Sequence, residues 1–476
     1  MIVIEKLTEA YIRVNCDEPS VKKEIDDFFS FRRPGFIVSK NQWQWLKKRD
    51  MKEPLFRERD STLPLGLMPK LTEWLRHNQY EYRIEGEFGS KNFSEVEALE
   101  FIKTLNIPEK FVVRDYQLKY FIKCVRNQRA VVISPTNSGK SLEIYLLYRF
   151  FNQKTLLTVP ITNLVYQMYD DFKDYGYDVE KNIHLLVPGQ EKTTDKQLTI
   201  SCWQSLIKQK KDFFEDFRVV FQDEVHGGKA ASLIKIMNMM YKTPIRIGLT
   251  GSMSKVPLYD HQIIGCFGPV IQYVSNEDLI KQGFSSPILI KSIELHHNMK
   301  MSTLLEYQDE VAYLLTQPKR TDFFVKLALS LKGNTFLMFN KIDHGKTMYE
   351  AIKNKADCPV YYVDGQTPAI ERDRLKKLIN DSEHCIVLAS TVFTTGVNIK
   401  SINNIVFTHP TKSRIRVLQS IGRGLRKSDS KDKLILYDVY DVLSQGLINT
   451  TLKHARERDK LYKEEKFPIK EYQISL

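Results

Sequence analysis

No long apolar run occurs in this sequence. A helix needs roughly 20 consecutive apolar residues to cross a bilayer, and none of the hydrophobic segments approaches that length. Hydrophobic residues make up 42% and charged residues 27% of the 476 residues, which is typical of soluble globular proteins. The first segment, MIVIEKLTEAYIRV, alternates as a strand does and includes Glu5 and Glu9, so it lacks the basic start and apolar centre of a signal peptide. We therefore expect a cytoplasmic protein that does not enter a membrane.

Cysteine is scarce and is never closely spaced. The six cysteines stand singly, without a C-x-x-C pair, at Cys16, Cys124, Cys202, Cys266, Cys358 and Cys385. This spacing favours neither a disulfide framework nor a zinc site, so we expect buried, reduced thiols. Internal repeats and low-complexity tracts are also missing from the sequence.

Acidic residues are too few to balance the basic ones. The sequence has 71 Lys and Arg against 58 Asp and Glu, which gives a net charge of +13 and a pI near 9.1. A basic protein favours polyanionic partners such as nucleic acid. Because many basic proteins bind no specific polyanion, the charge alone does not decide the partner.

Strand-like and helical patterns alternate through most of the chain. From about residue 110 onward, short β-branched runs alternate with longer helical patterns, and a second series of this kind begins after residue 330. Buried strands that alternate with helices predict doubly wound parallel sheets, whose ligands bind at the carboxyl ends of the strands. The predicted fold class is α/β with two such domains in tandem.

The segment DLIKQGFSSPILIKSIELHH joins the two series. Its Gly283 and Pro287 indicate a connection that follows a helix and enters a strand. The first hundred or so residues are strand-like at the start, have a helical pattern around Val21 to Phe29, and predict a small α+β domain. The predicted domains are residues 1–107, 108–287 and 288–476.

The stretch SPTNSGKS, Ser134 to Ser141, lies between the strand-like AVVI and the helical LEIYLLYRFF. In a Walker A loop, backbone N–H groups point at the phosphates, a lysine reaches the terminal phosphates and a hydroxyl ligates magnesium. Gly139, Lys140 and Ser141 fit these roles, although Ser134 replaces the first glycine of G-x-x-x-x-G-K-[ST]. By itself the stretch is either a nucleotide-binding loop or a polar turn.

An acidic pair follows a later apolar strand. In VVFQDEVH, Asp223 and Glu224 stand at the end of the strand-like run, where one carboxylate can hold Mg²⁺ through water and the other can polarise the attacking water. Paired carboxylates on a solvated turn are the alternative. Their position after a buried strand favours a Walker B pair.

Two arginines near the end of the second series complete the pattern. QSIGRGLRK supplies Arg423 and Arg426, which share one face if the segment is helical. An arginine that stabilises charge on the γ-phosphate raises the rate of hydrolysis by about 10³ to 10⁵. A solvated basic helix face is the alternative interpretation.

Taken in order, these segments resemble the motifs of the superfamily 2 helicases and translocases, whose two RecA-like domains clamp ATP between them. The similar segments are RDYQ (Arg114 to Gln117) for the Q motif, SPTNSGKS for motif I, VPITNLVYQ (Val159 to Gln167) for Ia, TISCWQS for Ic, DEVH for II, LTGS (Leu249 to Ser252) for III, FLMFN for IV, STVFTTGVNI (Ser390 to Ile399) for V and QSIGRGLR for VI. The resemblance implies an ATP-dependent helicase with ATP and Mg²⁺ as cofactors.

The resemblance also implies roles for single residues. Gln117 would contact adenine, Lys140 the phosphates and Glu224 the attacking water. The implied magnesium ligands are Ser141 and Asp223, and the residues implied at the γ-phosphate are Arg423 and Arg426. The further ATP contacts that it implies are Arg114, Thr136, Asn137, Ser138, Gly139 and Gly396.

Motifs II and III depart from the DEAD-box pattern. His226 stands at the fourth place of motif II, and Thr250, Gly251 and Ser252 replace S-A-T, which argues against the DEAD-box subgroup. The resemblance implies that His226 links the nucleotide state to the nucleic-acid track through Thr250 and Ser252, with Gln419 of motif VI also in a coupling role. A hydrogen-bonded core histidine is the alternative.

A closer resemblance is to the UvsW-type helicases of tailed phages, recombination enzymes that act on branched DNA. It adds DDFFSF (Asp26 to Phe31), LPLGL (Leu63 to Leu67), GRGLRK and LKHARERDKLYKEEKF (Leu452 to Phe467), and so covers nearly the full chain. It implies 3′ to 5′ travel on DNA and remodelling of forks, D-loops or Holliday junctions in recombination, repair or replication. The expected partners are single-stranded and branched DNA and phage recombination or replication proteins, and we expect a monomer.

Motifs Ia, Ic and V supply the candidate DNA contacts. Related motors grip the strand through its phosphates, so that binding is largely independent of sequence and sensitive to salt. The candidates are Thr162, Asn163, Gln167, Trp203, Gln204, Thr394 and Thr395. Trp203 is large and apolar, so core packing is as good an interpretation of it as base stacking.

Residues 31–59 form a basic and aromatic segment. Nine basic residues minus three acidic residues (Asp50, Glu53 and Glu58) leave a charge of +6, and the basic residues are Arg32, Arg33, Lys40, Lys47, Lys48, Arg49, Lys52, Arg57 and Arg59. With Trp43, Trp45 and Phe56 interleaved, the segment predicts a surface for a duplex arm or junction. The alternative is a solvated edge whose aromatic residues fill the domain's own core.

The last helical segment, HARERDKLYKEEKF, is strongly charged and is expected to pack on the second domain without a catalytic role.

Three other functions remain open on the sequence. An RNA-dependent helicase is the nearest, because a grip on phosphates need not exclude RNA. A motor subunit of a restriction complex would need a nuclease module or partner. A nonenzymatic branched-DNA-binding protein with a relic ATPase is the third, and the retained set of Lys140, Asp223, Glu224, Arg423 and Arg426 argues against it.

Overall fold

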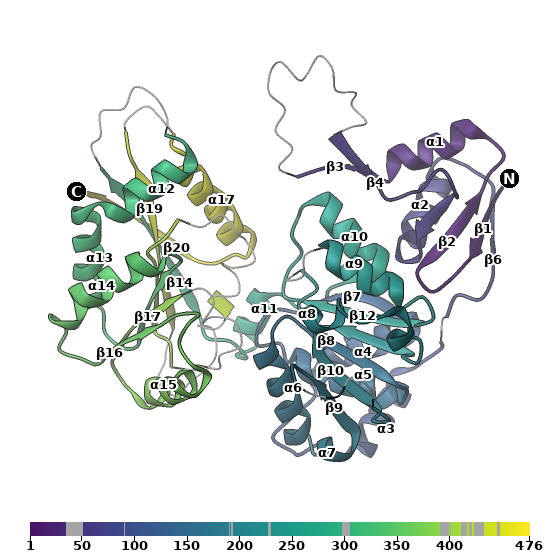
Figure 1. Ribbon diagram of the computed structural model, residues 1–476, viewed down its shortest axis with the longest axis horizontal. Helices are drawn as coiled ribbons and strands as arrows, with labels where there is room; N and C mark the ends of the chain where they lie inside the picture. The colour runs from purple at the N-terminus through teal and green to yellow at the C-terminus, as the bar shows by residue number, and fades with distance from the viewer. Residues whose placement is uncertain are drawn as a thin grey trace. The chain divides into compact units, whose positions relative to one another are not determined.

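The computed structural model describes residues 1–34, 51–89, 91–189, 191, 194–226, 230–297, 305–390, 399, 401–410, 417, 421–422, 433–444 and 448–476 (Figure 1). The chain divides into two compact units, which comprise residues 1–134 with 139–273 and residues 135–138 with 274–476. The N-terminal region therefore belongs to the first unit, and the three predicted domains with boundaries at 107 and 287 stay a prediction.

The first unit begins with a small mixed sheet, the purple part of Figure 1. Its strands are ordered β5-β2-β1-β6 and comprise β1 (Ile2–Lys6), β2 (Tyr11–Asn15), β5 (Thr62–Pro64) and β6 (Tyr82–Glu85). β1 pairs antiparallel with β2 and parallel with β6. A separate ladder joins β3 (Ser30–Arg32) to β4 (Lys52–Pro54). The predicted helix near Val21 is confirmed as α1 (Pro19–Phe28).

Alternation along β1 and β2 builds the core of this α+β region. Ile4 and Ile12 point inward and are fully buried, together with Leu71 of α2 (Met68–His77). Phe56 belongs to the same core and is 1% exposed. The alternative interpretation of the basic segment, in which an aromatic residue fills the core, is thus confirmed for Phe56.

The N-terminal region docks on α10 (Pro257–Phe267). The short turn η2 (Leu65–Leu67) lies against this helix, and a Cβ atom added to Gly66 would stand 2.0 Å from the Ile264 carbonyl oxygen. Because backbone meets backbone here, only glycine fits. The segment LPLGL, which the sequence analysis placed among the UvsW-like features, is this docking element.

The second sheet of the first unit has seven strands in the order β13-β7-β12-β11-β8-β10-β9, and all its pairings are parallel. The strands are β7 (Arg129–Ile133), β8 (Thr155–Val159), β9 (Ile183–Leu186), β10 (Leu198–Cys202), β11 (Val219–Gln222), β12 (Ile245–Thr250) and β13 (Val270–Ile271). The other helices of this part are α3 (Glu95–Thr104), α4 (Asp115–Asn127), α5 (Lys140–Phe151), α6 (Thr162–Asp174), α7 (Val179–Asn182), α8 (Trp203–Leu206) and α9 (Ala230–Met239), with the turn η3 (Lys211–Phe214).

The second unit has a seven-stranded sheet in the order β16-β17-β15-β18-β19-β14-β20, and again every pairing is parallel. Its strands are β14 (Ile288–His296), β15 (Thr335–Phe339), β16 (Val360–Val363), β17 (Ile386–Ser390), β18 (Asn404–Phe407), β19 (Leu434–Val442) and β20 (Ile469–Ser475). Its helices are α11 (Asn276–Lys281), α12 (Tyr307–Thr316), α13 (Pro318–Ser330), α14 (Ile342–Lys353), α15 (Ala369–Asp381) and α17 (Thr450–Glu464).

Helices cover both faces of this sheet. Successive strand residues point to opposite faces, so Leu337 and Leu388 join the core under α13 and α14, whereas Met338 and Val387 join the core that α15 and α17 cover. This is the doubly wound arrangement that the sequence predicts, and the α/β fold class with two tandem domains is confirmed.

The C-terminal end agrees only in part with the prediction. The charged helix α17 packs on the sheet of the second unit as expected, through buried residues that include Leu452 and Leu461. The edge strand β20, which the sequence did not predict, pairs parallel with β14. Five of the six cysteines are buried, as predicted, while Cys358 is partly exposed, and all six are free thiols. In the described residues no helix is long and apolar enough to span a bilayer.

Candidate active site

The phosphate-loop candidate connects β7 to α5, and α5 begins at Lys140. Asn137 and Gly139 have positive φ angles of 70° and 87°, a region that glycine adopts without strain. A Cβ atom on Gly139 would also lie 2.5 Å from Nε2 of Gln117. The turn therefore needs glycine at 139, and Thr136, Asn137 and Ser138 follow one another in the loop before it.

Gln117 holds this turn from the neighbouring helix. It lies in the first turn of α4 and is 2% exposed. Its Oε1 accepts a hydrogen bond from the Arg114 backbone N–H at 2.9 Å, and its Nε2 donates to the Gly139 carbonyl at 3.2 Å. The structure thus brings the Q-motif candidates Arg114 and Gln117 to the phosphate loop.

Lys140 stands between the loop and the acidic pair. Its Nζ donates to the Ser134 carbonyl at 3.2 Å and lies 3.9 Å from Oε1 of Glu224. The predicted lysine and the predicted Walker B glutamate, far apart in the sequence, therefore face each other. Ser141, the predicted magnesium ligand, hydrogen-bonds through its hydroxyl with the Tyr175 hydroxyl at 2.8 Å.

Asp223 and Glu224 directly follow β11, at the carboxyl edge of the sheet. Asp223 is 6% exposed, and burial, followed by the charge of Glu224, raises the pKa of its carboxyl above the ordinary value. Glu224 has a φ of 51°, which costs free energy for a residue with a side chain. Backbone strain of this kind beside a buried carboxyl is common at functional sites.

A third carboxyl at this site was not predicted. Ser134, which replaces the consensus glycine, donates its hydroxyl to Oε1 of Glu143 at 3.0 Å. Glu143 is 2% exposed, and burial raises its pKa to about 7. The sequence signal for it was a lone acidic residue within the apolar pattern LEIYLLYRFF.

His226 connects the acidic pair to the end of β12. The Thr250 hydroxyl donates to the Ser252 carbonyl at 2.9 Å, so it accepts the hydrogen bond that it shares with Nδ1 of His226. The same nitrogen lies 3.4 Å from Oε2 of Glu224. Burial lowers the pKa of His226, so the imidazole is neutral at pH 7. The three predicted coupling residues of motifs II and III are in hydrogen-bond contact.

The candidate DNA contacts of motifs Ia and Ic lie at the same sheet edge. Thr162 and Asn163 begin α6 after β8, while Trp203 and Gln204 begin α8 after β10, and these two strands are parallel neighbours. Nε2 of Gln204 donates to the Pro160 carbonyl at 3.2 Å. Gln167 follows in α6, partly buried.

Trp203 is half-buried against the hydrophobic core, which supports packing rather than stacking as its role.

The basic N-terminal segment is described only in part. Arg33 pairs with Glu53 at 3.7 Å, and Arg57 stacks over the Tyr11 ring with its guanidinium carbon 4.9 Å from the ring centroid. Phe31 stacks on His261 of α10, with the ring centroids 4.1 Å apart.

Several predicted residues lie outside the described residues, namely Lys40, Trp43, Trp45, Lys47, Lys48, Arg49, Asp50, Thr394, Thr395, Gly396, Gln419, Arg423 and Arg426.

The residues present fit ATP and magnesium. The loop has the tight, glycine-dependent turn that brings backbone N–H groups to phosphates, with Lys140 beside it. Ser141 and Asp223 offer the hard oxygen ligands that Mg²⁺ prefers. Burial and then the neighbouring Glu224 carboxylate raise the pKa of Asp223, and a divalent cation would relieve the repulsion between the two carboxylates.

Comparisons with known proteins give the same division of the chain. Residues 110–255 match the family described as "Type III restriction enzyme, res subunit", and residues 319–428 match the family described as "Helicase conserved C-terminal domain". The first range contains the phosphate loop and the acidic pair. The second range contains the segments that resemble motifs IV to VI.

Two curated proteins and a solved structure are similar over most of the chain. The "ATP-dependent DNA helicase uvsW" of Enterobacteria phage T4 is 30% identical over 96% of this chain and 96% of its own length. The "DNA 3'-5' translocase XPB2" of Sulfurisphaera tokodaii is 23% identical over 74% of this chain and 85% of its own length. The crystal structure of T4 UvsW covers 100% of this chain and 99% of its own, with 28% identity and a TM-score of 0.52.

Proposed function

Because the chain belongs to the UvsW-type helicases of superfamily 2 and is thus an ATP-hydrolysing helicase, we propose that it uses ATP hydrolysis to unwind or branch-migrate branched DNA. The substrates are forks, D-loops and Holliday junctions in recombination, repair or replication. The motor travels 3′ to 5′, acts as a monomer in the host cytoplasm, and works with phage recombination or replication proteins.

The choice of DNA and the direction of travel come from the relatives. The relative that shares 30% identity is a DNA helicase by name, and the second is a 3′ to 5′ DNA translocase by name. The net charge of +13 suits a polyanionic track. RNA remains the alternative track and is separated from DNA by the experiment below.

The single observation that carries the catalytic part of the proposal is the convergence of Lys140 on Glu224. A lysine that starts a helix behind a phosphate loop lies 3.9 Å from a glutamate that follows β11, which is separated from β7 in the sheet by β12. This arrangement places a positive charge at the terminal phosphates and a carboxylate where the attacking water needs orientation.

Each candidate residue of the nucleotide site has a defined part in hydrolysis under this proposal. Backbone N–H groups of the loop from Thr136 to Gly139 bind the phosphates, and Gln117 orients both the turn and the adenine. Glu224 orients the attacking water and accepts its proton. Ser141 and Asp223 would hold Mg²⁺, which would supply positive charge against the phosphates.

The remaining assignments follow the family motifs. Arg423, Arg426 and Gly396 complete the γ-phosphate end of the site, and Gln419 acts with them in coupling. DNA contacts come from the first turn of α6, from Gln204 in α8, and from Thr394 and Thr395. The basic segment at residues 31–59 binds the duplex arm of a junction.

Coupling between the ATP site and the DNA track runs through neutral His226. Its Nδ1 faces both Glu224 and Thr250, so a change in the position of the glutamate alters the hydrogen bond to the end of β12. Thr250 in turn holds the Ser252 backbone. A two-position switch of this kind links nucleotide state to motif III.

The experiment is steady-state ATP hydrolysis with no nucleic acid, single-stranded DNA, forked DNA, a four-way junction and matched RNA. We expect stimulation that is largest on branched DNA. Lys140→Ala and Glu224→Gln should each lower the stimulated rate by at least about 100-fold, because they remove phosphate contact and water orientation.

The control is Lys119→Ala, which removes a lysine that the mechanism does not use, from the same helix as Gln117. It should hydrolyse ATP at the wild-type rate. Stimulation mainly by RNA would move the protein to the RNA-dependent class. Tight junction binding with a turnover that is unchanged in Lys140→Ala would overturn the catalytic assignment.

A further inference from the structure

A group of three different metal-binding side chains lies at the amino ends of two strands in the second unit. β16 and β17 are parallel neighbours with Val360 opposite Ile386. Cys358 lies two residues before Val360, and His384 lies two residues before Ile386. Asp357 immediately precedes Cys358. The cluster is therefore at the opposite end of the strands from their carboxyl ends.

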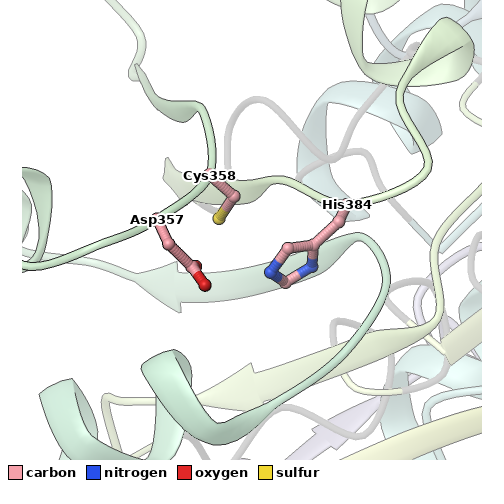
Figure 2. Close-up of side chains that lie close together, drawn as sticks. All are labelled: Asp357, Cys358 and His384. Atoms are coloured by element: carbon pink, nitrogen blue, oxygen red, sulfur yellow. The ribbon is translucent and has the colours of Figure 1, made fainter.

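The three side chains point toward one shared space (Figure 2). The sulfur of Cys358, a carboxylate oxygen of Asp357 and a ring nitrogen of His384 all lie within 4.8 Å of one another. In a tetrahedral site with metal–ligand distances of about 2.0 to 2.3 Å, neighbouring ligand atoms stand about 3.5 Å apart. Asp357 is exposed and precedes the strand, so rotation of its side chain can bring its carboxylate oxygen to this shorter distance from the other two ligand atoms.

The hydrogen bond of His384 prepares its ring for a metal. Nδ1 lies 3.1 Å from the Gly333 carbonyl oxygen, which can only accept, so Nδ1 carries the proton and donates it. In the neutral ring Nε2 is then unprotonated and free to coordinate. A backbone carbonyl that fixes the tautomer in this way is the common second partner of metal-bound histidines.

Asp357 and Cys358 supply the other two candidate ligand atoms. Among the described residues, neither the Asp357 carboxylate nor the Cys358 thiol has an ion-pair partner.

We propose that Asp357, Cys358 and His384 form a Zn²⁺ site, with water as the fourth ligand. One sulfur, one nitrogen and one oxygen ligand suit zinc, whereas Mg²⁺ and Ca²⁺ select oxygen. β16 is the edge strand of its sheet, so a metal bound to residues before β16 and β17 would fasten this edge to its neighbour. The site is independent of the nucleotide site.

Cobalt titration of the full-length protein tests the site directly. With one molar equivalent of Co²⁺ and excess Mg²⁺ present, the wild type should show the near-ultraviolet charge-transfer absorption of a cobalt–thiolate bond, and added Zn²⁺ should abolish it. Cys358→Ser should lose the band, and His384→Ala should need at least about tenfold more cobalt. Cys16→Ser, at a buried thiol elsewhere, should keep it.

Thiol reactivity provides a second readout, because Cys358 is the one cysteine of the six that is not buried. Ellman's reagent should modify one thiol quickly in the native protein, and one equivalent of Zn²⁺ should slow this reaction at least about tenfold. Zn²⁺ should not protect His384→Ala, whose fast thiol remains. Absence of the cobalt–thiolate band in the wild type, or equal protection of wild type and His384→Ala, would overturn the proposal.

Discussion

At the scale of single residues, the phosphate loop differs from its consensus at Ser134, and the structure gives a reason. The Ser134 hydroxyl is bound to the buried carboxyl of Glu143 in the first turn of α5. A serine at this place is therefore part of a hydrogen-bonded pair that joins the start of the loop to the helix behind it.

This pair predicts a pH dependence of stability. Burial raises the pKa of Glu143 from 4.5 to about 7, so between these values the folded protein keeps a proton that the unfolded chain releases. The contribution of this group to stability is complete below pH 4.5 and is lost as the pH rises to about 7. Because one pKa unit corresponds to about 1.4 kcal/mol, the free energy of folding that is lost is about 3 kcal/mol.

Thermal unfolding of wild type and Glu143→Gln at pH 5 and pH 8 measures this effect. Glutamine mimics the protonated acid, so the wild type should lose stability relative to the variant at the higher pH. Glu109→Gln, which alters an exposed residue, should differ from the wild type in stability by the same amount at both pH values. A wild-type-to-Glu143→Gln difference that does not change with pH would contradict the prediction.

At the scale of elements, α17 is charged along its length yet is fastened to β19 by a buried ion pair. Arg458 donates two hydrogen bonds of 2.8 Å to the two carboxylate oxygens of Asp438, and the Tyr462 hydroxyl donates to the same carboxylate at 2.7 Å. The arginine is 3% exposed and the aspartate is fully buried. The helix is thus held to the sheet by charge as well as by apolar packing.

Arg458→Met should destabilise the protein by about 3 to 5 kcal/mol, because it leaves the charge of Asp438 buried without its partner. In a unit of this size, that corresponds to a fall of roughly 10 °C in the melting temperature of the transition that includes α17. Calorimetry measures it.

The matched control is Arg456→Met on the same helix. Arg456 is exposed, so the change should stay within about 0.5 kcal/mol. The double variant Asp438→Leu with Arg458→Met should recover part of the loss, because no unpaired charge remains. Equal melting temperatures for Arg458→Met and Arg456→Met would show that the buried pair does not hold the helix.

At the scale of the whole molecule, the excess of 71 basic over 58 acidic residues predicts how nucleic-acid binding responds to salt. If the proposed track neutralises about 6 to 10 phosphates, affinity should fall about 10³- to 10⁵-fold between 50 and 200 mM salt. Fluorescence anisotropy with single-stranded DNA of several sequences measures it. ATP hydrolysis without DNA should change little over this range, and DNA affinity that is independent of salt would contradict a phosphate grip.

Features that depend on neighbouring residues were predictable from the sequence. The turn at Gly139 and Lys140, the acidic pair after β11 and the alternation of strands with helices depend on local patterns, so the α/β fold class and the residues that converge at the nucleotide site could be predicted. The short α1 was predicted for the same reason.

Contacts between residues that are distant in the sequence became known only from the folded chain. The contact of Ser134 with Glu143, the docking of Gly66 on α10 and the edge strand β20 depend on pairings between segments that no local pattern specifies. The same is true of Cys358 and His384, which the cysteine spacing gave no reason to join. Parallel strand register places them side by side because neighbouring strands align residues regardless of their distance along the chain.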